Sequence, residues 1–567
     1  MMPELRSYTI TLLTLLMLTL AFVVVTNYST LTADNNFVAG KQDNRTRIKG
    51  IVRSTFDNVE VDEQERTESF TDSASQGRET RPHVIFILAD DLGYNDVGYH
   101  NSHIISPTID KLATTGVRLE NYYVANLCSP SRAQLMTGRY QMRNGISQIL
   151  QPQYDECLPL SEVTIADVLR NAGYSTHLVG KWHLGYSRRE CTPTHRGFDS
   201  FLGFLSGSET YYDHTIGWPQ NGRHYSGYDF YVNERIAYEY KGQYSTHIFA
   251  RRTMDIIEQH NATEPLFIFL SLQAVHSPFD VPKKYIHINK HFKDPTRRIY
   301  AGMVTCMDEA IGNITQALKN NNMWDNTVLI FSTDNGGPLK DYEDPEFLNP
   351  TRTPTVASNW PLRGGKGSDW EGGIRGAAFV HSPLLMPQVR GTENRELMGM
   401  VDWLPTVAGY LGKANIDNLT LDGYNIWSTL SQGDASPRQE LLHNVVVSEH
   451  QSVYGAIRVG DWKLLQLGDI QGANVKFHVN RGLHIPPPEM NITIKSTKVE
   501  GSNPYTLLFN IKQDPRELHN LAAEHPQMTS LLRDKLTEYS KFIEHHGEKT
   551  LVDPEKCTRN KTIGPWL

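Results

Sequence analysis

The sequence has no excess of basic residues: 55 Lys and Arg stand against 63 Asp and Glu, which gives a net charge of −8 at neutral pH. A general nucleic-acid binder normally carries a clear basic excess, so no nucleic-acid partner is expected. The chain also lacks any compositional extreme, with 42 Gly and 29 Pro among 567 residues and 39% hydrophobic residues. Collagen-like, wholly disordered and multi-span membrane proteins are therefore excluded.

Cysteine is scarce, and its count is odd. The five cysteines are Cys128, Cys157, Cys191, Cys306 and Cys557. In an oxidising compartment an odd number leaves at least one cysteine unpaired or chemically modified. One of the five therefore needs a chemical explanation.

Long apolar runs are absent except near the N-terminus, where residues 8–25 (YTITLLTLLMLTLAFVVV) carry no charge. This run is long for the core of a cleaved signal peptide and just long enough to span a bilayer, and no small-x-small cleavage site follows it. Residues 1–26 are predicted to be a signal peptide or a type II signal anchor, and both alternatives stay open. Residues 27–81 are polar and predict a disordered stem.

Asn-x-Ser/Thr triplets, the acceptors of N-glycosylation, accompany this leader. They begin at Asn27, Asn44, Asn261, Asn313, Asn418, Asn491 and Asn560, of which the last five are predicted to be glycosylated. Single triplets arise by chance, but their number beside an apolar leader predicts a protein of the secretory pathway. Lysosome, Golgi, cell surface and extracellular space remain alternatives, with single-pass type II membrane anchoring as one outcome.

Short apolar runs alternate with amphipathic segments from residue 83 onward. The runs at 83–89, 175–180, 266–272 and 327–332 are apolar at consecutive positions, which predicts strands covered on both faces, as in a parallel sheet. Helices are predicted between them at 107–115, 162–172 (with Ser161 as its cap) and 301–318. The pattern predicts an α/β fold with a large, doubly wound and mostly parallel sheet over residues 82–437.

The pattern of apolar and polar residues changes after a polar stretch at 431–437. Short alternating segments at 441–447, 454–459, 462–467 and 505–510 predict an antiparallel sheet, and 527–546 predicts a closing helix. A smaller C-terminal α+β domain is therefore expected over residues 438–567.

Polar residues follow each of the four predicted parallel strands. They are Asp90 and Asp91, then Lys181 and His183, then His276, then Asp334 and Asn335. Because ligands of open α/β sheets bind at the carboxyl ends of the strands, these side chains are expected to share one crevice. Each fragment alone is more often a helix cap or a turn, but together they favour a site. The four oxygen donors suit Ca²⁺ or Mg²⁺ better than zinc.

Cys128 opens the segment 128–138 (CSPSRAQLMTG), in which Ser129, Pro130 and Ser131 predict the start of a helix. The free N–H groups of a helix N-terminus favour an anion, and Arg132 lies one turn on. A helix-capping turn with a buried cysteine is the simpler alternative. A phosphatase-type thiolate loop is another, but it needs five residues between Cys and Arg, and three stand here.

These motifs resemble the type I sulfatases. Residues 128–132 followed by 135–139 (LMTGR) match the signature whose Cys-x-Pro-x-Arg cysteine is oxidised to formylglycine, and 180–185 (GKWHLG) matches the second signature of that family. Further matches are 90–93 (DDLG), 332–337 (STDNGG), 360–366 (WPLRGGK), 370–376 (WEGGIRG) and 514–521 (DPRELHNL). The resemblance covers roughly residues 82–567 and implies the alkaline-phosphatase-like sulfatase fold. Within the family the sequence is most similar to the arylsulfatase B (N-acetylgalactosamine-4-sulfatase) group.

The resemblance implies a specific role for each residue of the site. Formylglycine made from Cys128 by the formylglycine-generating enzyme is the nucleophile, and one Ca²⁺ is held by Asp90, Asp91, Asp334 and Asn335 with residue 128 nearby. Arg132 and Lys181 hold the formylglycine, and Lys181 and Lys366 hold the sulfate oxygens. His183 is the base for elimination of sulfate, and His276 protonates the leaving alcohol, with help from Lys366.

The resemblance also bears on the remaining cysteines. It implies a disulfide between Cys157 and Cys191, whereas the usual partner of Cys557 is missing from 151–157 (QPQYDEC). Cys306 is expected to be a buried free thiol.

The implied substrate is a sulfated glycosaminoglycan or oligosaccharide, in particular the N-acetylgalactosamine 4-sulfate units of dermatan or chondroitin sulfate. Tyr211, Tyr212, Trp218 and Tyr225 are candidates for stacking on its sugar rings. Two alternatives remain: a phosphodiester or phosphonate hydrolase of the same superfold, and a catalytically silent, membrane-tethered glycan-binding protein.

Overall fold

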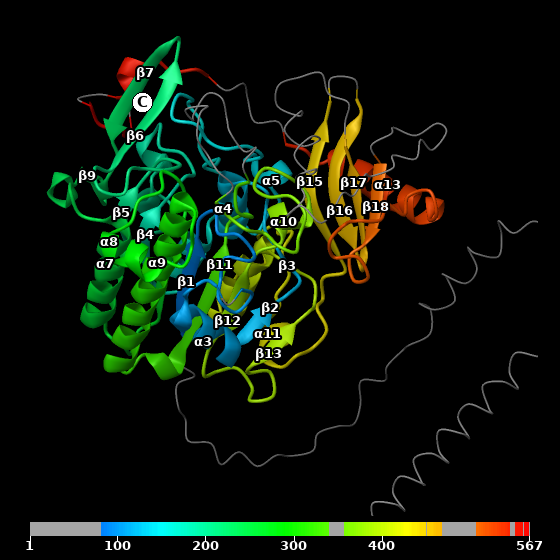
Figure 1. Cartoon of the computed structure of the whole chain (residues 1–567), viewed down its shortest axis with the longest axis horizontal. Coiled ribbons are helices and arrows are strands. Elements are labelled where there is room, and N and C mark those ends of the chain that lie inside the picture. Colours follow the sequence, from blue (N-terminus) through cyan, green and yellow to red (C-terminus); the bar gives the residue numbers. More distant parts are fainter. Residues whose placement is uncertain are drawn as a thin grey trace, which may run out of the picture. The chain divides into compact units, whose positions relative to one another are not determined.

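A mixed, mostly parallel sheet runs through the larger part of the computed structural model (Figure 1). The structure describes residues 81–101, 103–339, 356–448, 451–467, 506–544, 550–558 and 561–565. The ten strands are, in spatial order, β13 (Thr392–Asn394), β2 (Val117–Leu119), β12 (Ala378–His381), β11 (Thr327–Thr333), β1 (His83–Ala89), β10 (Leu266–Ser271), β4 (Ser175–Lys181), β5 (Ser200–Phe204), β8 (Tyr231–Val232) and β9 (Arg235–Ile236).

The five central strands, β11, β1, β10, β4 and β5, are all parallel, and β1 lies between β10 and β11. Antiparallel strands border them, because β12 pairs with β11 and β8 pairs with β5. The four predicted strands are thus neighbours, and the prediction of a large, mostly parallel sheet is confirmed.

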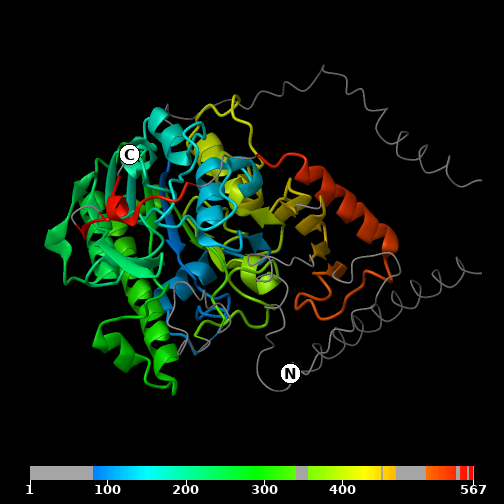
Figure 2. The same cartoon turned by 90° about the horizontal axis from the view of Figure 1, so that it is seen from above.

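Each central strand is buried on both faces. On β1, Val84, Phe86 and Leu88 pack into one core, whereas Ile85 and Ile87 pack into the core on the opposite face. The first core is covered by α4 (Cys128–Thr137) and α6 (Ile165–Asn171), and the second by α3 (Pro107–Thr115), α7 (Ser245–Gln259) and α9 (Pro295–Asn320). Figure 2 shows these helices on either side of the strands. Burial on both sides explains the consecutive apolar residues.

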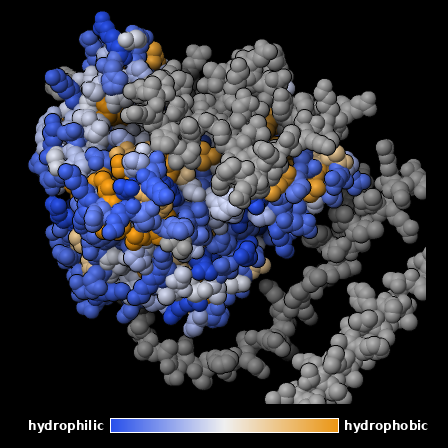
Figure 3. Space-filling view, in the orientation of Figure 1, coloured by the Kyte–Doolittle hydropathy of each residue, from blue (hydrophilic) through white to orange (hydrophobic). Residues whose placement is uncertain are grey.

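Polar residues dominate the outer surface in the view of Figure 3. α3, α7 and α9 are amphipathic, so their polar stripes face outward while their apolar stripes cover the sheet. α4, in contrast, is buried at every position. The remaining short elements are α5 (Gln141–Asn144), α8 (Lys283–Ile288), α10 (Glu371–Ile374), α11 (Trp427–Ser431), β3 (Tyr122–Tyr123), β14 (Met398–Gly399) and the hairpin of β6 (Thr215–Gln220) and β7 (Arg223–Tyr228).

The C-terminal antiparallel sheet also forms as predicted. It runs in the order β15 (Glu440–Val447), β16 (Val453–Val459), β17 (Trp462–Gln466) and β18 (Thr506–Asn510), and α13 (Pro526–Ser540) covers one face. The other face receives Trp370, which packs against Leu465, Leu507 and Phe509. The indole is 3% exposed. The sheet is therefore closed by a residue from the larger part of the chain.

After α13 the chain returns to the large sheet. Residues 550–558, which include α14 (Pro554–Cys557), and residues 561–565 are here called the strap. In the strap, the Ile563 N–H donates to Tyr228 O at 2.8 Å, and Val552 O accepts from Gln220 Nε2 at 3.0 Å. Val552 and Ile563 are buried in the core on one face of the large sheet. The last part of the predicted C-terminal domain thus packs on the large sheet, and the boundary at 437/438 stays a prediction.

Three helix ends differ from the predictions. α6 is capped by Thr164 and not by Ser161, because the Thr164 and Asp167 side chains bond reciprocally to backbone N–H groups in a capping box. α9 begins at Pro295, where Asp294 accepts from the N–H of Arg297, and so precedes the predicted start at residue 301. α13 ends at Ser540 rather than at residue 546.

The predicted leader (1–26) and all but the last residue of the predicted stem (27–81) lie outside the described residues. The predicted glycosylation sites Asn491 and Asn560 and the side chain of Cys557 also lie outside them. Among the residues that the structure describes, no helix has the length and apolar character needed to cross a bilayer. Asn261, Asn313 and Asn418 are exposed, and their glycosylation stays a prediction.

Candidate active site

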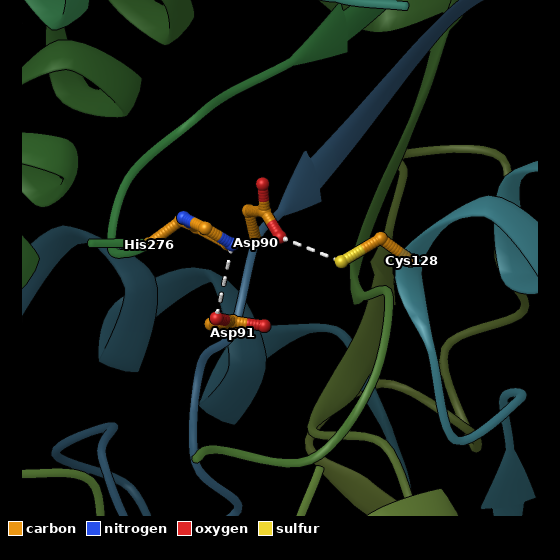
Figure 4. A group of neighbouring side chains, drawn as sticks. All are labelled: Asp90, Asp91, Cys128 and His276. Carbon is orange, nitrogen blue, oxygen red and sulfur yellow. Dashed lines mark hydrogen bonds and ion pairs between the residues drawn. The ribbon is translucent and has the colours of Figure 1, made fainter. Parts of the chain in front are cut away.

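The carboxyl ends of four adjacent strands carry the predicted site residues. Asp90 and Asp91 follow β1, Asp334 and Asn335 follow β11, and Lys181 is the last residue of β4. His276 lies beyond β10 and reaches the same place, since its Nε2 atom is 3.5 Å from Asp91 Oδ2. The convergence expected from the topology is present. Figure 4 shows Asp90 and Asp91 at the tip of β1, with His276 and Cys128 approaching from opposite sides.

Three buried carboxylates face three buried cations. Lys181 Nζ is 2.6 Å from Asp90 Oδ2, Arg132 Nη2 is 2.8 Å from Asp334 Oδ2, and Lys366 Nζ is 2.6 Å from Asp91 Oδ1. All six side chains are at most 4% exposed. The formal charges of this set therefore cancel, which makes the burial of so many ionised groups tolerable.

Burial and neighbouring charges shift the pKa values of two of these carboxylates in opposite directions. Burial opposes ionisation of Asp90, but Lys181, His276 and Arg132 outweigh it and hold the pKa below its usual range. For Asp334, burial and the neighbouring Asp90 charge raise the pKa. A divalent cation among these oxygens would relieve that repulsion.

The donor set fits a hard cation. Asn335 donates its Nδ2–H to Asp91 Oδ1 at 2.8 Å, while its Oδ1 atom is buried and has no hydrogen-bond partner. Donor atoms of Asp90, Asp91, Cys128 and His276 all lie within 4.8 Å of one another. Carboxylate and amide oxygens are the ligands that Ca²⁺ takes, so Asp90, Asp91, Asp334 and Asn335 can hold it. An oxygen without a partner inside a buried polar cluster is an expected place for a ligand bond.

Cys128 is the first residue of α4, as predicted. Its Sγ atom lies 3.5 Å from Asp90 Oδ1, and the side chain is 1% exposed. Burial raises the pKa of this thiol well above its ordinary value, an effect that Lys181 and Lys366 do not offset. A neutral thiol is a poor nucleophile, which argues against the phosphatase-type thiolate loop.

Arg132 lies four residues further along α4 and binds on both sides of the crevice. Its Nε and Nη2 atoms donate to Asp334 Oδ2, and Nη1 donates to the Ser271 hydroxyl at the end of β10. Ser271 was not among the predicted site residues, because a serine at a strand end has no distinguishing pattern. It orients the guanidinium between β10 and β11.

The two histidines present different ring nitrogens. In His276, Nδ1 lies 2.5 Å from the Ser277 carbonyl oxygen, so Nδ1 carries the proton and Nε2 faces the site. In His183, Nε2 lies 3.1 Å from the Leu150 carbonyl oxygen, and Nδ1 is buried without a partner. Burial lowers the pKa of both rings, and in His183 the charges of Lys181 and Arg132 lower it further.

Backbone strain accompanies two of these residues. Asp91 has φ 60° and His183 has φ 57°, and both lie in the left-handed region that non-glycine residues seldom occupy. Such conformations persist where surrounding contacts over-determine them. They are common at functional sites.

Lys366 reaches the site on a loop that is tied to α4. The Gly367 N–H donates to Asn126 O, and Asn126 Nδ2 donates to Asp369 Oδ1 at 2.7 Å. Neither Asn126 nor Asp369 was predicted, because both lie just outside the family motifs at 128–132 and 370–376. They fix the loop whose lysine enters the carboxylate cluster.

Two of the four aromatic residues proposed for ring stacking are not available for it. Tyr211 is 1% exposed and donates its hydroxyl to His276 O at 2.9 Å, and Trp218 is fully buried against Tyr225. Both were assigned by residue type alone, and the large apolar rings instead serve the core. Tyr211 holds the backbone of His276 rather than a sugar.

The cysteines outside the site are accounted for in part. Cys157 and Cys191 form a disulfide, as the resemblance implied, and Cys306 is a buried free thiol.

Comparison with known proteins identifies the family. The model of the family described as Sulfatase matches residues 82–413, which is more than half of the chain. The chain belongs to the sulfatase family. Among curated relatives of this sulfatase, arylsulfatase J of Mus musculus is 42% identical over 498 residues, covering 84% of this chain and 78% of that protein. The N-acetylgalactosamine-6-sulfatase of Homo sapiens is 26% identical over 518 residues, covering 87% and 91% respectively.

Solved sulfatase structures share the fold. The structure described as Ps i-CgsB in complex with k-i-k-neocarrahexaose has a TM-score of 0.64 and 27% identity, and covers 82% of this chain and 94% of that chain. The chain is thus a sulfatase, a sulfuric ester hydrolase. The narrower similarity to arylsulfatase B stays a prediction, since these relatives carry other names.

Proposed function

We propose that this sulfatase hydrolyses sulfate esters with a formylglycine made from Cys128 and with one Ca²⁺ bound by Asp90, Asp91, Asp334 and Asn335. The observation that carries the proposal is the position of Cys128. Its side chain begins α4, lies against Asp90, and is enclosed by three carboxylates and three cations. That arrangement suits a tetrahedral sulfate group, either in a monoanionic sulfate ester or as the free sulfate dianion. It offers a thiolate little stabilisation.

The modified residue and the metal ion would supply the chemistry that a thiol lacks: a hydroxyl nucleophile on one carbon, and polarisation of the sulfate oxygens. The chain's own residues do the rest. Lys181, Lys366 and Arg132 fix negatively charged oxygens in a site closed to water, where such contacts are strong. Because the three cations are matched by three carboxylates, a bound Ca²⁺ would give the crevice the net positive charge that attracts an anionic substrate.

The two histidines would move protons on opposite sides of the reaction. His276 would donate a proton from Nε2, the nitrogen that faces the site, to the oxygen of the leaving alcohol. Because Nδ1 already carries the proton of the neutral ring, this donation requires the doubly protonated imidazolium, which the charges of Asp91 and Asp90 favour against the effect of burial. His183 would accept a proton at Nδ1, the nitrogen that has no partner, during release of sulfate. The lowered pKa of His183 keeps it unprotonated and ready to accept.

The proposed substrate is a sulfated glycosaminoglycan sugar, with N-acetylgalactosamine 4-sulfate of dermatan or chondroitin sulfate as the specific candidate. Support comes from the relatives, of which one is named an N-acetylgalactosamine-6-sulfatase and another was solved with k-i-k-neocarrahexaose. We also propose that the protein enters the secretory pathway, where the formylglycine-generating enzyme acts on it. Its final location is lysosome, Golgi, cell surface or extracellular space.

Mass analysis of the peptide carrying residue 128 tests the chemistry. Protein produced with the formylglycine-generating enzyme should show the loss of the thiol sulfur, and should hydrolyse nitrophenyl sulfate faster than nitrophenyl phosphate. The Cys128→Ala variant should bind Ca²⁺ but lack turnover. An unmodified thiol with no turnover would instead support a glycan-binding protein, and a preference for the phosphate ester would support a phosphodiester or phosphonate hydrolase.

Defined disaccharides test the substrate. Sulfate release from N-acetylgalactosamine 4-sulfate at the end of a chondroitin disaccharide should exceed release from the matched 6-sulfate. The reverse order would overturn the 4-sulfate assignment and leave the sulfatase chemistry standing.

A further inference from the structure

A buried charge cluster joins two family motifs, which the site itself does not use, to a strand of the C-terminal sheet. Glu371 belongs to residues 370–376 (WEGGIRG), Lys463 lies on β17, and Glu517 belongs to residues 514–521 (DPRELHNL). Lys463 Nζ is 2.9 Å from Glu371 Oε1 and 2.8 Å from Glu517 Oε1, and all three side chains are fully buried. These residues, here called the Glu–Lys–Glu triad, connect the C-terminal sheet to the larger part of the chain.

The triad fixes the first turn of α10 in position and direction. Glu517 Oε2 accepts the backbone N–H of Glu371 at 2.8 Å, and Glu371 Oε2 accepts the Tyr123 hydroxyl at 2.8 Å. Arg363, at the other end of the same loop, donates to Glu517 O at 3.1 Å. Both ends of residues 363–371 are therefore held by Glu517.

Lys366 lies in the middle of that loop, and α10 touches the metal-ligand turn directly. The Gly336 N–H, next to Asn335, donates to Gly373 O at 2.9 Å. A Cβ atom added to Gly336 would lie 1.8 Å from Gly372 O, so the two backbones are in close contact. Lys366 N–H in turn donates to Gly337 O at 3.2 Å. A shift of α10 would move Lys366 and press on Asp334 and Asn335.

Stability alone is a weak reason for such a cluster. A buried ion pair contributes little net stability compared with apolar packing of the same volume, although loss of one partner is costly. The neighbouring Trp370 already supplies the apolar contact, since it packs against Phe509 on the same sheet. The ions add directional contacts, because both oxygens of Glu371 and Oε2 of Glu517 have hydrogen-bond partners. Glu517 Oε1 lies 2.8 Å from Lys463 Nζ as an ion pair without a hydrogen bond.

We propose that Glu517 and Lys463 are positioning residues for Lys366, through which the C-terminal sheet sets the geometry of the sulfate-binding site. Neither side chain reaches the site, so the effect passes through Glu371 and the loop 363–371. Figure 1 shows α10 between the large sheet and the C-terminal strands. The inference rests on the proposed role of Lys366 in holding sulfate.

Glu517→Gln is the variant that tests this with least risk to the fold. Gln keeps the shape of Glu517 and can still accept the Glu371 N–H. Gln removes the negative charge that faces Lys463 Nζ at 2.8 Å. Asp402→Asn is the matched control, because Asp402 is a fully buried carboxylate paired with Arg438 (Nε to Oδ2, 2.8 Å) near the start of β15. No described contact joins that pair to residues 363–371.

The kinetic readout is a double-mutant cycle with nitrophenyl sulfate. Glu517→Gln should lower kcat/KM about 10–100-fold and raise the inhibition constant of inorganic sulfate, because a misplaced cation binds the anion poorly. Asp402→Asn should leave both constants within about twofold of the wild type. In a Lys366→Ala background, Glu517→Gln should change kcat/KM by no more than about twofold. An undiminished effect in that background, or equal effects of Glu517→Gln and Asp402→Asn, overturns the proposal.

Hydrogen exchange gives a readout that needs no activity. Peptides covering residues 363–376 should exchange about tenfold faster in Glu517→Gln than in the wild type, and unchanged in Asp402→Asn. If the wild type fails to hydrolyse nitrophenyl sulfate, the proposed function is wrong. The hydrogen-exchange rates of residues 363–376 still test whether the Glu–Lys–Glu triad positions this segment. If Glu517→Gln does not fold, Lys463→Arg replaces it with the same expectations. Failure of both to fold, with Asp402→Asn folded, makes the triad a folding element and refutes a positioning role.

Discussion

At the residue scale, the two histidines of the site can be told apart by chemistry. His276 presents Nε2 toward Asp91, whereas His183 presents an unpartnered Nδ1. If His276 protonates the leaving alcohol, its contribution to the rate is large for an alcohol that needs a proton to leave and small for one that leaves as a stable anion. If His183 acts only in the release of sulfate, its contribution to the rate is the same for every ester.

We therefore expect His276→Ala to lower kcat on an alkyl or sugar sulfate about 10²–10⁴-fold, the usual contribution of a general acid. On nitrophenyl sulfate, whose leaving group departs as a stable anion, the loss should be much smaller. His183→Ala is the control and should reduce turnover of both esters equally. Steady-state kinetics with the two substrates makes the comparison, and equal losses for His276→Ala on both would exclude it as the acid.

Charge at the site predicts how calcium and anions influence one another. Three carboxylates and three cations already cancel, so Ca²⁺ alone adds two positive charges to a buried site. A sulfate dianion restores neutrality, and coupling between two ligands is reciprocal.

Calorimetric titration of the wild type with CaCl₂ should thus give at least about fivefold higher affinity in the presence of inorganic sulfate than in its absence. Lys366→Gln removes one positive charge and should tighten Ca²⁺ binding without sulfate while it weakens the sulfate effect. Ca²⁺ affinity that does not respond to sulfate in the wild type would contradict this charge balance.

At the element scale, four of the five central parallel strands could be predicted closely, because burial on both faces leaves consecutive apolar residues. The fifth, β5, and the helix α7 were not predicted. β1 and α3 begin and end where the sequence predicts. The short border strands β2, β12 and β13 could not be predicted, since segments of three or four residues carry no periodicity.

The same contrast applies to the site. Residues at strand ends and in family motifs were found, but Ser271 and Lys463 were not. Their roles depend on which elements pack together, and no local pattern of residues encodes that.

The packing of α3 on α9 predicts a pH dependence. Asp308 of α9 accepts the N–H of Ile109 in the first turn of α3 at 2.7 Å, and burial raises its pKa from 3.8 to about 6. A carboxyl whose pKa is higher in the folded protein binds its proton more tightly there. The stability it contributes is complete below about pH 4 and is lost as the pH rises through 6.

Asp308→Asn keeps an acceptor for Ile109 but cannot titrate. Between about pH 4 and pH 7, the free energy of unfolding of the wild type should fall by about 1–3 kcal/mol more than that of the variant. Urea unfolding at several pH values measures both curves. Parallel curves would mean that Asp308 ionises in the folded protein as readily as in the unfolded chain.

At the scale of the whole molecule, the two sheets depend on each other. Trp370 closes one face of the C-terminal sheet, and the strap places Val552 and Ile563 in the core beneath the large sheet. A chain that ends at the predicted boundary would lose these contacts, and the apolar surfaces that they cover would be exposed to water.

We expect residues 82–437 expressed alone not to fold, and residues 82–567 to unfold in a single cooperative transition. Scanning calorimetry and circular dichroism of the two products test this, with the longer one as control for removal of the leader and stem. A cooperative melting transition of the shorter product would show that the C-terminal part is an independent accessory.

The position of β1 between β10 and β11 also limits the time during which Cys128 can be modified. Cys128 is buried in the folded chain, so the proposed enzymatic oxidation of its thiol would have to precede pairing of the central strands. Thr333, the last residue of β11, emerges from the ribosome 205 residues after Cys128. At roughly 5–20 residues per second this delay is about 10–40 s. The topology thus keeps the cysteine reachable during translation and closes over it afterwards.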